Sequence, residues 1–492
     1  MKRVLLLVIT GVVGLLLTTS TGYARRYART SPGHQVRTIP APGPSADPKA
    51  SLAVVGGRLI DGVGGDPLEN SVVLVDGQRI VAVGQVGQLA VPETAKIVNA
   101  DGMTVLPGLW ESHGHLVHVG AARANEFPVK FKNELQKIMS TVARVTLLAG
   151  VTTFRDTGGP LLEQQALRRE IEAGTKLGPR LYLAGPILYQ RNSGPANKEE
   201  RMARVAQTVG IAAGEYGVST PEEARAMTER VIALKVDQVK VYDVWDQAVL
   251  EAVTAAAHKH GIGVDADVRH MDVYRTAVLA GVDRLQHVFT ADALADYTDE
   301  ELRLLVRGNP LGRSATSFRG PYMVPTMETR QSQVRTFQFP GLVDHPRFRD
   351  QFEPSLYKYL LETWHEGLTM ASPNRVDARE RMRIVKQKIR RFIEAGGGQQ
   401  LVAGTDAGSP YNFHSAVARE VADLVDAGLS PMEAIQSATL RPAQMQGVDA
   451  QLGTISVGKL ADIIIVDGDP LQEIEVLQNH VIHVIKNGVA YK

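Results

Sequence analysis

Two histidines separated by one glycine stand at the end of an apolar segment of this chain. In LPGLWESHGH the run from Leu106 leads to His113, Gly114 and His115. Side chains two residues apart on a strand point to the same face, so both imidazoles can offer a nitrogen to one cation. Two histidines do not complete a metal site, and the other ligands must come from distant segments.

The composition restricts what those ligands can be. The chain has 492 residues and no cysteine, which excludes disulfides, thiolate zinc sites and cysteine nucleophiles. Any metal must therefore be held by nitrogen and oxygen. Lys and Arg total 54 against 53 Asp and Glu, with the basic excess in residues 1–50. This balance is not the footprint of a nucleic-acid-binding protein, and the length suits one large α/β domain with a smaller one.

The N-terminus has the features of an export signal. Two basic residues precede an apolar run from Val4 to Leu17, and the small-residue pattern GYA ends at Ala24. We expect a signal peptide over residues 1–24, cleaved after Ala24, and an exported, periplasmic or secreted protein without stable membrane insertion. A retained membrane anchor is the alternative. Residues 25–50, rich in Pro, Ser, Ala and Arg, are predicted to be a disordered linker.

The periodicity of the remaining chain changes near Leu106. Before it, alternating segments such as Ser71–Gly84 predict antiparallel hairpins. After it, strands alternate with helical segments such as Pro221–Lys235 and Asp246–Gly261. Eight such strands favour an α/β fold, a (β/α)8 barrel, whose chemistry lies where strands end. The predicted strands cover residues 105–113, 151–156, 180–185, 237–243, 262–268, 282–288, 322–327 and 401–408.

Residues able to bind a metal lie on these strands. The first predicted strand ends with His113 and His115, the fourth carries Lys240, the sixth carries His287 and the eighth ends in Asp406. A lysine in an apolar strand is notable, because burying an ammonium without a partner is costly. We therefore expect these side chains to meet at one end of the barrel.

Six segments of the chain are, in order, PGLWESHGH, GVTTFRDTGG, VKVYD, AGVDRLQH, AGTDAG and LGTISVGKLADIIIVDGDPL. In this order they resemble the metal-dependent amidohydrolase superfamily, and within it the prolidase and imidazolonepropionase-related branch. The resemblance runs from about Leu52 to the end of the chain. It implies a distorted (β/α)8 TIM barrel over residues 106–448 and a small β-sandwich built from residues 51–105 and 449–492.

The resemblance also implies a pair of divalent ions. His113, His115 and Asp406 would bind the more buried ion, and His287 would bind the second. Lys240, carboxylated by carbon dioxide, would bridge both. The carbamate makes physical sense because an ammonium repels cations, whereas a carbamate is an anionic ligand with two oxygens. Zinc is the first choice of metal, with manganese, cobalt and iron as alternatives.

One position departs from the family pattern. The fifth strand normally supplies a histidine to the second ion, and the corresponding place here is Asp267 in GVDADVRHMD. Asp267 can itself ligate the ion, or His270 can reach it through an altered strand end. A weak or empty second metal site is the third alternative.

The expected chemistry is hydrolysis of a C–N bond. A bound divalent ion lowers the pKa of its water ligand and yields hydroxide near neutral pH. Asp406 would take the proton and deliver it to the leaving nitrogen. Tyr242, two residues beyond Lys240, is predicted to contact a substrate carbonyl or carboxylate, and His414 resembles a position that reaches substrate in relatives.

The favoured substrate is a small amide or peptide, such as a dipeptide or an N-acyl amino acid. A cyclic amide, a carbamate or a lactone is the enzymatic alternative. The alternative of another class is a catalytically inactive barrel that serves as a binding or scaffold protein. The departure from the family pattern at Asp267 keeps this alternative open. The oligomeric state stays open, and a homo-oligomer is one of the states considered.

Overall fold

The computed structural model describes residues 49–124, 126–191, 215–242, 244, 246–268, 271–290, 297–308, 320–338, 349, 352–370 and 375–492. All of these residues fall in one compact unit. Within them, no helix combines the length and the apolar character that crossing a membrane requires. The predicted signal peptide, nearly all of the predicted linker and the alternative ligand His270 lie outside the described residues.

Two small sheets are built from the segments before and after the central region. The predicted hairpin is confirmed, since β3 (Ser71–Asp76) and β4 (Arg79–Gln85) pair antiparallel. In the other sheet, β6 (Thr104–Pro107) pairs antiparallel with β16 (Ile463–Val466), with Leu106 opposite Ile464. One buried cluster contains Val54 and Val73 of the first sheet and Ile463 of the second, so the segments before and after the central region fold together. The predicted β-sandwich itself stays a prediction.

The first sheet has the order β4 (Arg79–Gln85), β3 (Ser71–Asp76), β1 (Leu52–Val55), β5 (Lys96–Asn99). The second has the order β18 (Val489–Ala490), β17 (Val481–Lys486), β16 (Ile463–Val466), β6 (Thr104–Pro107), β2 (Arg58–Leu59).

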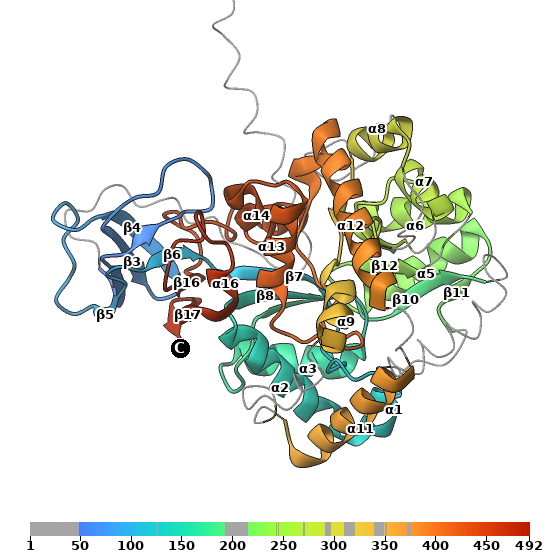
Figure 1. Ribbon diagram of the computed structural model, residues 1–492, viewed down its shortest axis with the longest axis horizontal. Coiled ribbons are helices and arrows are strands. Elements are labelled where there is room, and N and C mark those ends of the chain that lie inside the picture. Colours follow the sequence, from blue (N-terminus) through green and yellow to red (C-terminus); the bar gives the residue numbers. More distant parts are fainter. Residues whose placement is uncertain are drawn as a thin grey trace, which may run out of the picture. The chain divides into compact units, whose positions relative to one another are not determined.

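The central region contains two parallel sheets (Figure 1). The smaller has the order β7 (Leu109–Gly114), β8 (Val151–Asp156), β9 (Arg180–Leu183). The larger has the order β11 (Gly217–Val218), β10 (Ile187–Gln190), β12 (Val239–Tyr242), β13 (Val264–Asp267), β14 (Arg284–Gln286), β15 (Tyr322–Val324). Parallel strands need crossover connections, and helices supply them.

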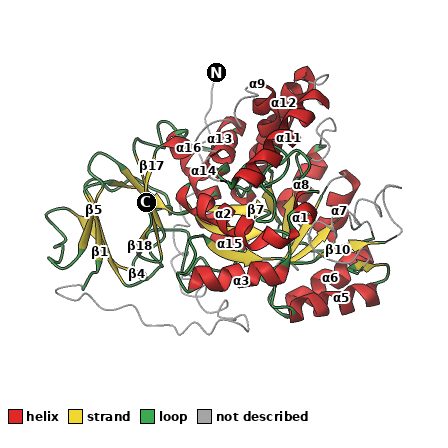
Figure 2. Cartoon of the chain, turned by 90° about the horizontal axis from the view of Figure 1, so that it is seen from below, coloured by secondary structure: helices red, strands yellow, loops and turns green. Residues whose placement is uncertain are grey.

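The predicted helices on either side of β12 are confirmed as α5 and α6, which pack against each other (Figure 2). Thr220 caps α5 by accepting a hydrogen bond from the Glu223 N–H, and Pro221 occupies its first turn. The described helices are α1 (Phe127–Lys130), α2 (Leu135–Leu148), α3 (Leu161–Glu172), α5 (Pro221–Ala233), α6 (Gln247–Lys259), α7 (Met271–Leu279), α8 (Asp299–Arg307), α9 (Glu328–Gln338), α11 (Pro354–Met370), α12 (Arg375–Phe392), α13 (Val417–Ala427), α14 (Pro431–Ser437), α15 (Leu440–Met445) and α16 (Val476–Asn479).

The predicted first strand is divided in two at Gly108. The residues before it form β6 of an outer sheet, and those after it form β7 of a parallel sheet. A Cβ atom at Gly108 would lie 2.2 Å from the Thr152 hydroxyl oxygen, so glycine allows β8 to approach. The third predicted strand, residues 180–185, is also shorter than expected, because β9 ends at Leu183. A separate strand, β10, follows it and pairs with β12.

The predicted eighth strand, residues 401–408, is not a regular strand. It makes one isolated parallel bridge from Leu401 to Met323 and another from Ala407 to Gly114. Asp406 has a φ of 59°, and this left-handed conformation interrupts the extended backbone that a ladder needs. The described strands therefore do not form a continuous closed barrel, although this segment still joins the two parallel sheets.

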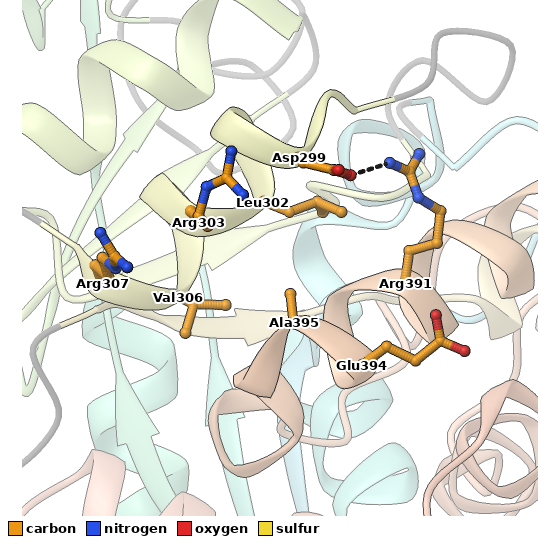
Figure 3. Close-up of a pocket in the computed structure, with 8 residues that line it drawn as sticks. All are labelled: Asp299, Leu302, Arg303, Val306, Arg307, Arg391, Glu394 and Ala395. Carbon is orange, nitrogen blue, oxygen red and sulfur yellow. Dashed lines mark hydrogen bonds and ion pairs between the residues drawn. The ribbon is translucent and has the colours of Figure 1, made fainter.

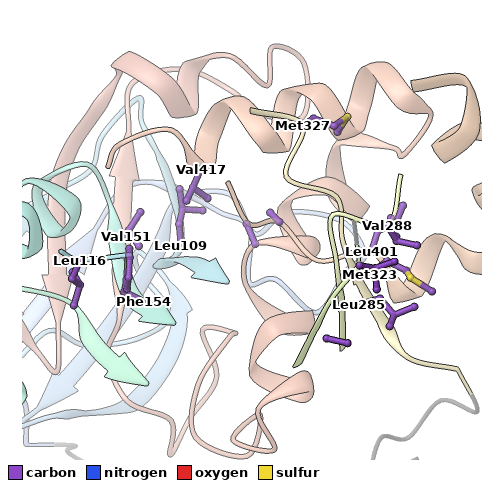
Figure 4. Close-up of a cluster of buried hydrophobic side chains, with 14 of the residues drawn as sticks. Leu109, Leu116, Val151, Phe154, Leu285, Val288, Met323, Met327, Leu401 and Val417 are labelled. Carbon is purple, nitrogen blue, oxygen red and sulfur yellow. The ribbon is translucent and has the colours of Figure 1, made fainter. Parts of the chain in front are cut away.

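Figure 4 shows part of a large buried hydrophobic cluster of the central region. It includes Leu109, Val151 and Phe154 on β7 and β8, and Leu285 and Met323 on β14 and β15. Each fully buried side chain of this kind contributes roughly 1.5–3 kcal/mol to folding. The close packing of this cluster holds the strand ends, and the polar side chains on them, in fixed positions.

Candidate metal centre

Three predicted ligands from the two ends of the central region meet. The Nε2 atom of His113 lies 3.6 Å from Asp406 Oδ1, and that of His115 lies 3.3 Å from the same oxygen. One donor atom from each residue lies within 4.8 Å of the other two. The His113 and Asp406 side chains are nearly inaccessible to water, so the structure brings together a buried set of two nitrogens and a carboxylate.

Each histidine of this set uses its other ring nitrogen in a hydrogen bond. The Nδ1 of His113 lies 2.6 Å from Gln286 Oε1, and that of His115 lies 3.0 Å from the Gly158 carbonyl oxygen. Both partners are acceptors, so each Nδ1 carries the proton and donates it. In the neutral imidazole the lone pair is then on Nε2, which is the tautomer that a metal ligand requires.

The other three predicted ligands form a second group around Asp267. Its Oδ2 lies 3.4 Å from Lys240 Nζ and 3.5 Å from His287 Nε2. The His287 Nδ1 hydrogen-bonds to the Thr326 hydroxyl at 2.7 Å. The two groups adjoin, because the ring centres of His113 and His287 are 4.7 Å apart.

Two buried atoms of the second group fit a bound cation. Lys240 is 1 % exposed, yet its Nζ makes no hydrogen bond with the described residues, and neither does His287 Nε2. A buried polar atom left without a hydrogen bond costs about 1–3 kcal/mol. A ligand bond from the imidazole, and a carbamate on the lysine, would satisfy both atoms, so these residues fit the divalent ions that the donor set suits.

Two of these residues adopt a strained backbone conformation. His287 has a φ of 62° and Asp406 a φ of 59°, a region that costs a residue other than glycine about 1–3 kcal/mol. Backbone hydrogen bonds hold both, from His287 N–H to the Val324 carbonyl at 3.0 Å and from Asp406 N–H to the His113 carbonyl at 2.7 Å. Such strain is concentrated at functional sites, which agrees with a site at this place.

The charges of the site favour a metal-binding state. Burial and the nearby charge of Lys240 hold the pKa of His113 well below its usual range, so this imidazole is neutral at neutral pH. Burial alone would raise the pKa of Asp406. The nearby imidazoles, first of all that of His115, outweigh burial and lower that pKa well below its usual range. Asp406 is therefore an ionised carboxylate.

Glu111 is a site residue that the sequence reasoning missed. It is buried under the cluster, where Oε1 accepts hydrogen bonds from the His113 N–H at 3.0 Å and the Thr405 N–H at 2.9 Å. The Thr405 hydroxyl donates to Oε2 at 2.5 Å. Burial raises the pKa of Glu111 to about 7. An acidic residue two positions before His113 on an apolar strand was the available signal.

The two predicted substrate contacts are buried beside the site. Tyr242 packs with Ile187 and Tyr189. His414 donates from Nε2 to the His118 carbonyl at 2.7 Å, and burial lowers its pKa to about 4. His414 thus holds the loop that follows β7, and a contact with substrate stays a prediction for both residues.

A cavity of about 450 Å³ lies between α8 and the end of α12 (Figure 3). Leu302, Val306 and Ala395 contribute apolar surface, and the Arg391 guanidinium donates to Asp299 at 2.9 Å. None of the predicted ligands lines this cavity, so it is separate from the candidate metal centre.

Comparison with known proteins agrees with this geometry. The Amidohydrolase family matches residues 104–490. An imidazolonepropionase of Symbiobacterium thermophilum is 24 % identical over 442 residues, which cover 84 % of this chain and 90 % of that protein. The solved structure of a Xaa-Pro dipeptidase with bound methionine in its active site has a TM-score of 0.68 and 25 % identity, covering 90 % of this chain and 99 % of the other.

A third comparison supports the fold. The solved structure of molinate hydrolase has a TM-score of 0.66 and 23 % identity, and it covers 90 % of this chain and 95 % of that one. The parallel sheets with alternating helices accordingly form a TIM-barrel-like α/β fold. With its buried donor set and a match over most of its length, the chain belongs to the amidohydrolase family and is a metal-dependent hydrolase of carbon–nitrogen bonds.

Proposed function

We propose that this protein is an exported enzyme that hydrolyses the amide or peptide-like bond of a small substrate, such as a dipeptide or an N-acyl amino acid. One observation carries the proposal. The Nε2 atoms of His113 and His115 and a carboxylate oxygen of Asp406 converge in a buried position. The similarity to a Xaa-Pro dipeptidase over most of both chains supports a dipeptide, and the similarity to an imidazolonepropionase supports a cyclic amide as the alternative.

The residues suit a pair of divalent ions, with zinc as the first choice. His113, His115 and Asp406 would hold one ion, and Asp267 and His287 would hold the other. Lys240 would join them as a carbamate, because its buried Nζ faces Asp267 and has no hydrogen bond within the described part of the chain. When bound, a divalent cation supplies a Lewis acid that polarises a carbonyl and activates water.

Asp406 is placed to move protons. Its carboxylate is ionised, and its Oδ1 lies beside His113 and His115 at the end of the strand region. In the proposed reaction, water adds to the carbonyl carbon and Asp406 accepts its proton. The C–N bond then breaks, and Asp406 returns the proton to the leaving nitrogen. This general base and acid role contributes typically 10²–10⁴-fold to the rate.

Tyr242 would face the substrate from β12. It lies two residues beyond Lys240 on the same face of the strand, with Tyr189 opposite it in the register. The phenol of Tyr242 would donate to a substrate carbonyl or carboxylate oxygen, while the side chains of Ile187 and Tyr189 would pack against an apolar group. In this proposal the two parallel sheets form the distorted (β/α)8 barrel, and the two outer sheets form the β-sandwich.

Elemental analysis and a substrate panel test the proposal. Purified protein is expected to contain stoichiometric divalent metal and to hydrolyse some members of a panel of dipeptides, N-acyl amino acids and chromogenic amides. Asp406→Asn is expected to lower kcat at least 10²-fold, with metal content measured in parallel. Asp449→Asn, the same change at an exposed position, is the control and is expected to leave kcat unchanged.

The alternatives give different results in the same experiment. Turnover of lactones, carbamates or cyclic amides but not of dipeptides would identify the enzymatic alternative. Absence of metal and of turnover after reconstitution with Zn²⁺ or Mn²⁺ and bicarbonate would favour the inactive scaffold. Export is tested separately, because a cleaved signal peptide predicts that N-terminal sequencing of the mature protein begins after Ala24.

A further inference from the structure

A chain of buried hydrogen bonds leads from His113 to two arginines. The His113 Nδ1–H donates to Gln286 Oε1 at 2.6 Å, and the Gln286 amide donates from Nε2 to Asp265 Oδ1 at 2.6 Å. The other carboxylate oxygen of Asp265 accepts from Arg155 at 2.9 Å and from Arg284 at 3.3 Å. All of these side chains are almost fully buried.

The two arginines are themselves fixed by backbone and amide partners. Arg155 donates to the Ser112 carbonyl at 3.0 Å and to the Gln446 side-chain oxygen at 3.0 Å. Arg284 donates to the Met445 carbonyl at 2.7 Å. The carboxylate of Asp265 between two guanidinium groups is therefore an anion held in one orientation.

The orientation of the Gln286 amide follows from this anion. A carboxylate only accepts hydrogen bonds, so the edge of the amide that faces Asp265 must be the NH₂ group. The carbonyl oxygen then faces His113, and a carbonyl oxygen only accepts. The proton of the His113 imidazole is consequently fixed on Nδ1, and its lone pair is fixed on Nε2.

We propose that Gln286, oriented by the Arg155–Asp265–Arg284 cluster, is a positioning residue that fixes the metal-binding tautomer and the ring orientation of His113. This inference rests on the proposed metal site at His113, His115 and Asp406. The partner is a neutral amide rather than a carboxylate, so Gln286 orients the imidazole without adding negative charge next to it. Outer partners of this kind typically contribute 10–100-fold to metal affinity.

Zn²⁺ affinity without substrate tests the proposal. Full-length protein is stripped of metal, and the dissociation constant is measured by competition with a chromophoric chelator. Gln286→Met, which has nearly the same shape but neither donor nor acceptor, is expected to bind Zn²⁺ 10–100-fold more weakly than the unmodified protein. Gln286→Glu keeps an oxygen toward His113 but loses the donor toward Asp265, and its affinity is expected to lie between the two.

Gln400→Met is the matched control. Gln400 is a buried glutamine whose side-chain NH₂ donates to the Leu305 and Pro321 carbonyls, which belong to none of the predicted ligands. The Gln400→Met variant is expected to lower the urea midpoint of the metal-free protein as much as Gln286→Met does, while its Zn²⁺ affinity stays within twofold of that of the unmodified protein. A merely structural role for Gln286 would give the two variants equal affinity, which would overturn the proposal.

The failures of the two proposals are distinguishable. If the unmodified protein binds no Zn²⁺, the metal site is wrong and the role of Gln286 falls with it. If the unmodified protein binds Zn²⁺ and the dissociation constant of Gln286→Met is within twofold of its value, only the role of Gln286 is refuted. If circular dichroism shows that Gln286→Met does not fold, Gln286→Glu decides, because unchanged affinity in that variant contradicts the proposal and a loss of at least threefold supports it.

Discussion

Removing the carboxylate of Glu111 is expected to destabilise the protein strongly. This side chain accepts hydrogen bonds from the His113 and Thr405 backbone N–H groups and from the Thr405 hydroxyl. In Glu111→Ala both buried N–H groups lose their acceptor, whereas the hydroxyl can rotate toward another one. Each stranded donor costs about 1–3 kcal/mol, so the free energy of unfolding should fall by about 2–6 kcal/mol. That is a large part of the 5–15 kcal/mol typical of a folded protein.

Urea unfolding followed by far-ultraviolet circular dichroism measures this effect on metal-free protein. Glu111→Gln is the matched control, because its carbonyl oxygen still accepts from both N–H groups and its NH₂ donates to the Thr405 hydroxyl. We expect this variant to lose less than about 1.5 kcal/mol, the net worth of one hydrogen bond. A loss below 1 kcal/mol for Glu111→Ala, or equal losses for the two variants, would refute the reasoning.

Two further predictions concern buried ionisable groups away from the predicted ligands. Glu420 on α13 accepts from the Met327 N–H at 3.0 Å and the Glu328 N–H at 2.8 Å. Glu420→Ala should therefore lower the free energy of unfolding by about 2–4 kcal/mol. Glu420→Gln keeps one acceptor oxygen, so its stability should lie between those of Glu420→Ala and the unmodified protein. Equal urea midpoints for the two variants would contradict this. Burial and the charge of Arg180 lower the pKa of Lys486 from its ordinary 10.5 to about 8. Between about pH 8 and 10.5 the unfolded chain then binds more protons than the folded chain. The free energy of unfolding of the unmodified protein should therefore rise with pH over this range, by up to about 3 kcal/mol more than that of Lys486→Met. Parallel pH dependences of the urea midpoints of the two proteins would show this to be wrong.

The sequence by itself determined the local features of this protein. The spacing of His113 and His115 placed two imidazoles on one strand face, and the absence of cysteine required nitrogen and oxygen ligands. Periodicity predicted the β3–β4 hairpin and the helices α5 and α6, because these patterns depend on neighbours a few residues apart. Signals of this range do not show that Gly108 divides the first predicted strand or that Asp406 interrupts the eighth.

Only the tertiary structure decided which nitrogens face the site. His113 and Gln286 are 173 residues apart, and Thr405 and Glu111 are 294 apart. Whether such residues meet depends on the register of several strands, and no local pattern records that register. The pairing of β6 with β16 was likewise decided by packing, because their apolar side chains become buried only when these two segments, far apart in the sequence, meet. The buried partners that select the His113 tautomer are therefore a property of the folded chain, whereas the pair of histidines was already visible in its sequence.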